Sequence, residues 1–202
     1  MSVESGNADV PENKPNRGGR ELFNLPNKLT LSRFILSVVF FFLLSYEFFI
    51  SALVVFFLAV VTDWFDGYYA RKRGQSTDLG RMADPFVDKV IICGGFIIMI
   101  PLAEEIVAPW MVIVIVMREF FVSSIRGYSE SKGVPFASNI WGKTKMFCQS
   151  VTIFILILYV AHFSSIGWTG YVVYSGMWIT VIVTLFSAVF YLISGKKVLL
   201  AS

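Results

Sequence analysis

The chain has 202 residues, of which 56% are hydrophobic and 15% charged, with a formal net charge of +3 and a mean hydropathy of +0.70. This composition excludes an ordinary soluble domain. Apolar segments long enough to cross a bilayer recur along the chain, so we expect an all-α, polytopic membrane helix bundle that forms one domain. Both cysteines, Cys93 and Cys148, lie in apolar stretches, where we expect small buried side chains rather than a disulfide.

The N-terminal segment is polar. Residues 1–20, MSVESGNADVPENKPNRGGR, hold few sizeable apolar side chains, which predicts a disordered cytoplasmic tail over 1–22. The tail lacks the apolar stretch of a signal peptide, and its acidic residues argue against a mitochondrial transit peptide. The next segment, NLPNKLTLSRF (24–34), mixes leucines with basic residues. It predicts a short interfacial amphipathic helix before the first span, the alternative being a basic flank of that span.

Six hydrophobic stretches predict six transmembrane helices, near residues 31–46, 48–70, 84–103, 107–127, 141–163 and 168–194. If successive spans alternate in direction, the N-terminal tail, two of the loops and the C-terminus lie on one side of the membrane. These segments carry nearly all the Lys and Arg residues outside the spans, whereas the three turns on the opposite side carry none. Basic loops stay in the cytoplasm, so we expect both termini there, in a multi-pass protein of the cell inner (plasma) membrane. Residues 23–197 would form the domain, followed by a short tail over 198–202.

Four acidic residues lie at the ends of two neighbouring apolar stretches: Asp63, Asp66, Asp84 and Asp88. On helices, spacings of three and four residues put each pair on one face, and the short loop between them allows the two faces to meet. A carboxylate at bilayer depth costs on the order of 3 kcal/mol, and mutual repulsion adds to this cost. We therefore expect hard divalent cations in a two-metal site that clamps a phosphoryl group. Pairing with the neighbouring basic residues is the alternative.

A glycine and an alanine follow the first acidic pair. Gly67 inside a helix costs about 1 kcal/mol relative to alanine, so it needs a reason. With Ala70 one turn further on, it predicts a groove where a flat ligand approaches the backbone. Close helix packing is the alternative interpretation.

The two helix ends carry the pattern Asp63-x-x-Asp66-Gly67-x-x-Ala70-Arg71, then eight residues, then Gly80-x-x-x-Asp84-x-x-x-Asp88. This pattern resembles the signature of the CDP-alcohol phosphotransferase family at every fixed position. The resemblance implies a six-helix membrane enzyme, usually a homodimer, that displaces CMP from a CDP-linked substrate. It implies that two Mg²⁺ or Mn²⁺ ions bind Asp63, Asp66, Asp84 and Asp88, with Asp88 also the general base. It further implies that CDP-diacylglycerol is bordered by Asp66, Gly67, Ala70, Arg71 and Gly80.

The acceptor is indicated by residues 117–149. Arg118 and Glu119 lie inside the apolar stretch VIVIVMREFFV, an expensive placement that indicates function. Arg118, Arg126 and Lys143 together predict a cationic pocket for a phosphate dianion. The alternatives are pairing of Arg118 with Glu119 or the aspartates, and extension of Arg126 and Lys145 to the cytoplasmic interface.

Three segments resemble the bacterial branch of the family that accepts glycerol 3-phosphate: NLPNKLTLSRF, REFFVSSIR and GKTKMFCQ. That branch commonly has Thr-Gly where this chain has Ser123-Ser124. The resemblance implies transfer of a phosphatidyl group from CDP-diacylglycerol to glycerol 3-phosphate in phospholipid biosynthesis, among membrane lipids and without nucleic acid. Inositol phosphate, serine and phosphatidylglycerol are alternative acceptors. A cation transporter is an alternative of another class, but transporter sites tend to lie near the bilayer midplane rather than at one interface.

Overall fold

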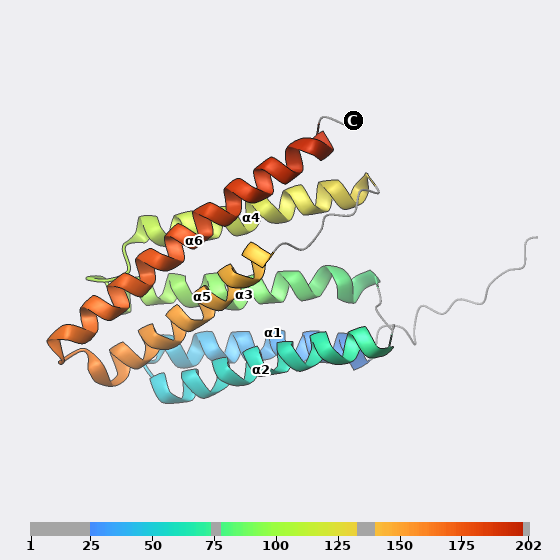
Figure 1. Ribbon diagram of the computed structural model, residues 1–202. Coiled ribbons are helices and arrows are strands. Elements are labelled where there is room, and N and C mark those ends of the chain that lie inside the picture. Colours follow the sequence, from blue (N-terminus) through green and yellow to red (C-terminus); the bar gives the residue numbers. More distant parts are fainter. Residues whose placement is uncertain (1–24, 74–77, 133–139, 200–202) are drawn as a thin grey trace, which may run out of the picture.

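The computed structural model describes residues 25–73, 78–132 and 140–199 (Figure 1). Within these ranges the chain is helical and contains no strand, which confirms the predicted all-α class. The elements are α1 (Leu25–Ser45), α2 (Phe49–Arg73), α3 (Asp78–Leu102), α4 (Pro109–Ser131), α5 (Ile140–Leu158), a π-helical turn η1 (Tyr159–Phe163) and α6 (Gly167–Leu199).

The first helix begins earlier than the first predicted span. Pro26 lies in its first turn, where a missing N–H costs little, and no Gly or Pro interrupts the helix before Ser45. Residues 25–34 are therefore the first turns of α1, and the described residues contain no separate interfacial helix. The prediction of such a helix was wrong for this part of the chain.

The turn from α1 to α2 is closed by backbone hydrogen bonds. Phe48 N–H donates to the Leu43 carbonyl at 2.8 Å and Glu47 N–H to the Leu44 carbonyl at 3.1 Å, while Glu47 has a φ of 62°. This is the Schellman pattern, in which a left-handed residue ends the helix. The turn falls where the sequence predicted it.

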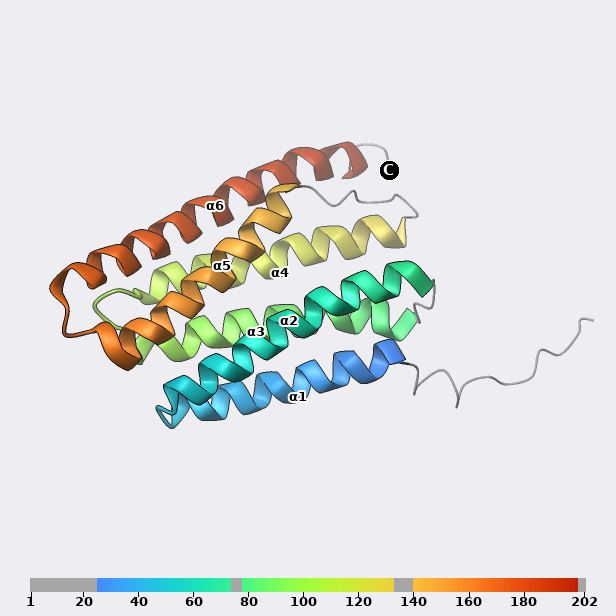
Figure 2. The same cartoon turned by 60° about the horizontal axis from the view of Figure 1, so that its bottom comes forward.

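The helices form a single bundle. The first helix packs against α2 and α3, whereas α6 packs against α4 and α5, and α3 joins the two groups through α4 and α5 (Figures 1 and 2). The start of α1, the end of α2, the start of α3 and the ends of α4 and α6 all point the same way (Figure 2). We call this end of the bundle, with Arg73 and Asp78, the site end.

The buried charged residues gather in one half of the interior. The apolar core lies away from the site end and includes Phe40, Phe96, Met99, Ile115 and Ile157. Buried charged side chains lie toward the site end, on α1, α4 and α5. Because buried charges are expensive, their concentration in one half indicates a functional site there.

The outer surface carries many exposed large hydrophobic side chains, along α1, α2, α4 and α6. Two stretches, Gly142–Phe163 and Gly167–Ile193, are long and apolar enough to cross a membrane, and α1 and α2 contribute the shorter apolar stretches Thr30–Ser45 and Phe49–Thr62. A surface of this kind suits contact with lipid better than contact with water. The structure therefore supports a helical protein associated with a membrane.

Candidate active site

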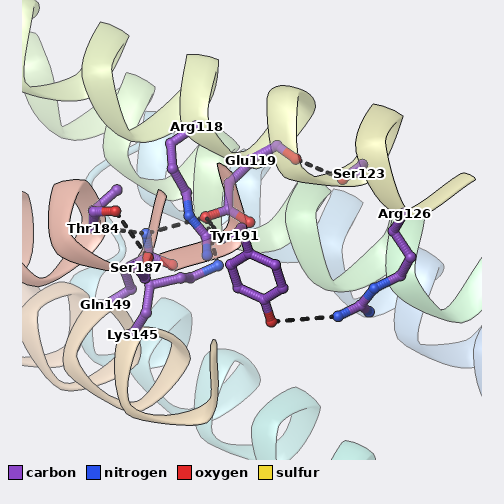
Figure 3. Close-up of polar contacts among 9 residues, drawn as sticks. All are labelled: Arg118, Glu119, Ser123, Arg126, Lys145, Gln149, Thr184, Ser187 and Tyr191. Atoms are coloured by element: carbon purple, nitrogen blue, oxygen red, sulfur yellow. Dashed lines mark hydrogen bonds and ion pairs between the residues drawn. The ribbon is translucent and has the colours of Figure 1, made fainter. Parts of the chain in front are cut away.

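One buried carboxylate connects α4 with α5. Glu119 Oε1 lies 2.5 Å from Lys145 Nζ and 3.2 Å from Arg118 Nη1, and it accepts a longer hydrogen bond, 3.4 Å, from Gln149 Nε2 (Figure 3). The same Gln149 nitrogen lies 3.4 Å from Thr184 Oγ1 on α6. The cluster thus joins three helices in the site-end half of the bundle.

The cluster carries more positive than negative charge. Glu119 is 3% exposed, Lys145 4% and Arg118 7%, so two buried cations share one buried anion. Moreover, Arg118 Nε and Nη2 are buried and have no hydrogen-bond partner among the residues that the structure describes. Unpaired buried donors cost free energy, and charged donors cost most. An excess of positive charge with free N–H groups is what a bound anion would satisfy.

A tyrosine of α6 contacts two arginines of α4. The guanidinium carbon of Arg118 lies 5.3 Å from the ring centroid of Tyr191, within the range of a cation–π contact. Arg126 Nη2 donates to Tyr191 Oη at 3.5 Å (Figure 3). Arg126 Nε is buried and has no hydrogen-bond partner in the described part of the chain. The sequence alone does not distinguish Tyr191, because a tyrosine near the end of a membrane span is common.

On the neighbouring helices, Arg33 of α1 pairs with Asp88 of α3. Arg33 is buried and Asp88 is half-buried. The helix α3 also packs against α4 and α5, which carry the cluster around Glu119. The helix that carries Asp88 is therefore a neighbour of both helices of that cluster.

The three residues predicted to bind the acceptor differ in their burial and in their contacts. Arg118 and Arg126 both approach Tyr191, whereas the side chain of Lys143 is exposed and no described residue forms an ion pair with it. The buried lysine is Lys145, so the alternative of extension to the interface was wrong for this residue. The pairing of Arg118 with Glu119, the other alternative, is observed.

Seven of the predicted donor and metal residues lie on the facing ends of α2 and α3. Asp63, Asp66, Gly67, Ala70 and Arg71 lie on the last turns of α2, and Gly80 and Asp84 lie on the first turns of α3, so all seven are on helix backbone at the site end. Their side chains lie outside the described residues. Among the described side chains no group of three or more His, Cys, Asp or Glu could hold a metal ion. The metal assignment stays a prediction.

Two serines of α4, Ser123 and Ser124, bond to their own helix. Ser123 Oγ donates to the Glu119 carbonyl at 2.5 Å, and Ser124 Oγ donates to the Phe120 carbonyl at 3.0 Å. Both hydroxyls thus bond to their own helix, in the i−4 manner usual for serine in helices. Both cysteines are free in the structure; Cys93 is buried, as predicted, whereas Cys148 is half-buried.

Together, these features define a helical, membrane-associated protein with a polar site enclosed toward one end of the bundle. The chain belongs to the CDP-alcohol phosphatidyltransferase family, whose model matches residues 23–191.

Several bacterial relatives are named CDP-diacylglycerol–glycerol-3-phosphate 3-phosphatidyltransferase. The protein of Bacillus subtilis (strain 168) is 33% identical over 161 residues, which cover 72% of this chain and 82% of the relative. That of Blochmanniella floridana is 29% identical over 187 residues, covering 89% and 94%. That of Wigglesworthia glossinidia brevipalpis is 36% identical over 143 residues, covering 66% and 76%.

Proposed function

We propose that the chain transfers the phosphatidyl group of CDP-diacylglycerol to glycerol 3-phosphate and releases CMP. Family membership and the names of the relatives support this reaction. The structural observation that carries the choice of acceptor is the buried cluster, in which Arg118 and Arg126 approach Tyr191 and keep N–H donors without partners. Such donors suit the phosphate dianion of a water-soluble acceptor.

The acceptor alternatives differ in charge. Serine carries no phosphate and would leave the arginine donors unpaired, and phosphatidylglycerol is a second lipid whose phosphate diester carries a single charge. Inositol phosphate presents the same dianion as glycerol 3-phosphate, so the cluster suits both compounds. The relatives' names favour glycerol 3-phosphate. In this proposal Arg118, Arg126 and the exposed Lys143 bind the acceptor phosphate.

The proposed topology has six transmembrane helices, with both termini and the site end at the cytoplasmic face of the inner (plasma) membrane. The distribution of Lys and Arg among the loops supports this orientation. CDP-diacylglycerol would enter laterally from the bilayer, and glycerol 3-phosphate from the cytosol. The active form would be a homodimer, as in other members of the family.

The donor would lie at the ends of α2 and α3, bordered by Asp66, Gly67, Ala70, Arg71 and Gly80. Asp63, Asp66, Asp84 and Asp88 would hold two Mg²⁺ or Mn²⁺ ions. Carboxylate oxygens are the ligands these hard ions prefer, and both helix ends lie at the site end, so the donor set fits. When bound, the ions would neutralise the charge that develops on the phosphoryl oxygens.

The proposed mechanism begins with the acceptor phosphate held by the cationic residues of α4 and α5, which orients the primary hydroxyl of glycerol 3-phosphate. Asp88 takes the hydroxyl proton, and the oxygen attacks the phosphorus that bears diacylglycerol. The bond from this phosphorus to CMP breaks, and CMP leaves with the bonding pair. Arg33 Nη1 donates a hydrogen bond to Asp88 Oδ1 and so orients the carboxylate that takes the proton.

The test is CMP release by the purified protein in detergent–lipid micelles. CDP-diacylglycerol is supplied with glycerol 3-phosphate, inositol phosphate, serine or phosphatidylglycerol, each with Mg²⁺, with Mn²⁺ or with excess chelator. We expect release with glycerol 3-phosphate, and only when a divalent ion is present. CMP release with inositol phosphate but not with glycerol 3-phosphate would overturn the assignment of glycerol 3-phosphate as the acceptor. Metal-driven ion flux into vesicles without CMP release would favour the transporter instead.

A further inference from the structure

We propose that Tyr191 is a positioning residue for the acceptor: it holds Arg118 and Arg126 at the separation that an acceptor phosphate requires, and Gly142 provides the space for its hydroxyl. This inference rests on the proposed function. It assigns a role in acceptor binding to α6, the helix in which the sequence analysis predicted none.

The ring of Tyr191 stabilises Arg118 without using its N–H donors. Tyr191 is 4% exposed and lies under the guanidinium of Arg118, with 5.3 Å between the guanidinium carbon and the ring centroid. A cation–π contact attracts the charge through the face of the ring and consumes no hydrogen bond. A carboxylate in the place of the Tyr191 ring would neutralise the positive charge of Arg118 and occupy its N–H donors. Arg118 Nε and Nη2 consequently stay unpaired.

The hydroxyl of the same side chain restrains the second arginine. Arg126 Nη2 donates to Tyr191 Oη at 3.5 Å, and no described residue forms a hydrogen bond with Arg126 Nε. Arg118 and Arg126 are two helical turns apart on α4, and flexible side chains of this length would otherwise separate by mutual repulsion. One rigid tyrosine therefore holds both cations with free donors on each. This arrangement is suited to binding one dianion between two guanidinium groups.

The position of the hydroxyl depends on a glycine of α5. A Cβ at Gly142 would lie 2.6 Å from Tyr191 Oη but 3.6 Å from Cζ and 3.8 Å from Cε2. The first distance is too short for any real Cβ, and the other two are ordinary contacts. A side chain at residue 142 therefore conflicts with the hydroxyl and not with the ring. Gly142→Ala should displace the hydroxyl from Arg126, and Tyr191→Phe should remove this conflict.

The experiment measures kcat, KM for glycerol 3-phosphate and KM for CDP-diacylglycerol in the full-length protein and in Tyr191→Phe, Gly142→Ala and the double variant. Loss of a hydrogen bond to a charged group predicts a roughly tenfold or greater rise in KM for glycerol 3-phosphate in each single variant. KM for CDP-diacylglycerol should stay unchanged. The double variant should be no worse than Tyr191→Phe alone, because the conflicting hydroxyl is gone. Gly170→Ala is the matched control, since its Cβ would meet the Tyr159 hydroxyl at an ordinary 3.5 Å.

The outcomes separate this inference from the proposed function. Absence of glycerol 3-phosphate-dependent CMP release in the unaltered protein would remove the proposed function itself. Normal activity with an unchanged KM for glycerol 3-phosphate in Tyr191→Phe would overturn only the role of Tyr191. Additive effects of Tyr191→Phe and Gly142→Ala would do the same, because additivity means that the two residues do not act through one contact. If Tyr191→Phe does not fold, Gly142→Ala supplies the test with the tyrosine in place.

Discussion

Arg33 Nη1 of α1 lies 2.8 Å from Asp88 Oδ1 of α3, although 55 residues separate the two in sequence. Arg33 is only 2% exposed, so this ion pair is screened from solvent on the arginine side. It holds one oxygen of the carboxylate that the sequence predicted as general base. A basic residue that seemed to belong to a membrane flank is thus directed into the bundle.

Replacement of Asp88 should abolish turnover. Asp88→Asn keeps the size of the side chain but removes the group that accepts the proton, and general-base catalysis contributes typically 10²–10⁴-fold. We expect CMP release to fall by about this factor or more, while the protein still inserts and purifies as a folded species. Full activity of purified Asp88→Asn would contradict the base assignment.

Replacement of Arg33 should lower kcat more than it raises KM. Arg33→Met keeps the length of the side chain but frees Asp88, and loss of a residue that orients a ligating or catalytic group typically costs 10–100-fold in activity. Arg33→Lys should recover part of this loss, since a lysine retains the charge but lacks the planar group. The measurement is steady-state CMP release with both substrates varied. An unaltered kcat in Arg33→Met would show that the ion pair does not serve the reaction.

The two lysines of the GKTKMF segment should behave differently. Lys145 is buried against Glu119, whereas Lys143 is exposed. Lys143→Gln should leave thermal stability unchanged and raise KM for glycerol 3-phosphate, because it removes only a charge near the phosphate. Lys145→Gln should also lower the melting temperature in detergent. A normal KM in Lys143→Gln would exclude Lys143 from the acceptor pocket.

Glu119 should be important for stability. In Glu119→Gln, Arg118 and Lys145 would both be buried without an anion, and breaking a buried ion pair by removing one partner costs about 3–5 kcal/mol. We expect a large fall in the free energy of unfolding, measured by denaturation in mixed micelles. Glu119→Gln combined with Lys145→Met should recover part of this loss, because one of the two uncompensated charges is removed. No recovery would indicate that Glu119 stabilises the bundle by other means.

Close contact between α1 and α3 should be sensitive to one methyl group. A Cβ at Gly94 would overlap the ring of Phe41, whereas a Cβ at Gly127 would meet nothing within 4 Å. Gly94→Ala should therefore destabilise the fold by about 1–3 kcal/mol, the usual cost of overpacking. Gly127→Ala is the control, and it should be neutral or slightly stabilising, because alanine is the better helix former. Equal melting temperatures for the two variants would show that Phe41 moves aside without cost.

The six helices could be predicted from the sequence, because long apolar stretches separated by polar or Gly- and Pro-containing turns determine them. Their ends were found to within a few residues in most cases, although α1 and α3 each begin six residues before their predicted spans and α6 ends five residues after its span. The family could also be predicted, since its signature is a local pattern of fixed residues on two successive helices. The burial of Arg118 and Glu119 follows from their place in an apolar stretch.

The partners of these charges were decided by the tertiary structure alone. Three contacts join different helices: Arg33 with Asp88, Glu119 with Lys145, and Arg126 with Tyr191. Hydrophobic periodicity indicates which residues lie inside a bundle, but a charge in the interior can pair with any opposite group that helix packing brings near. Which groups meet depends on how the helices rotate and cross, and packing across the whole core determines this.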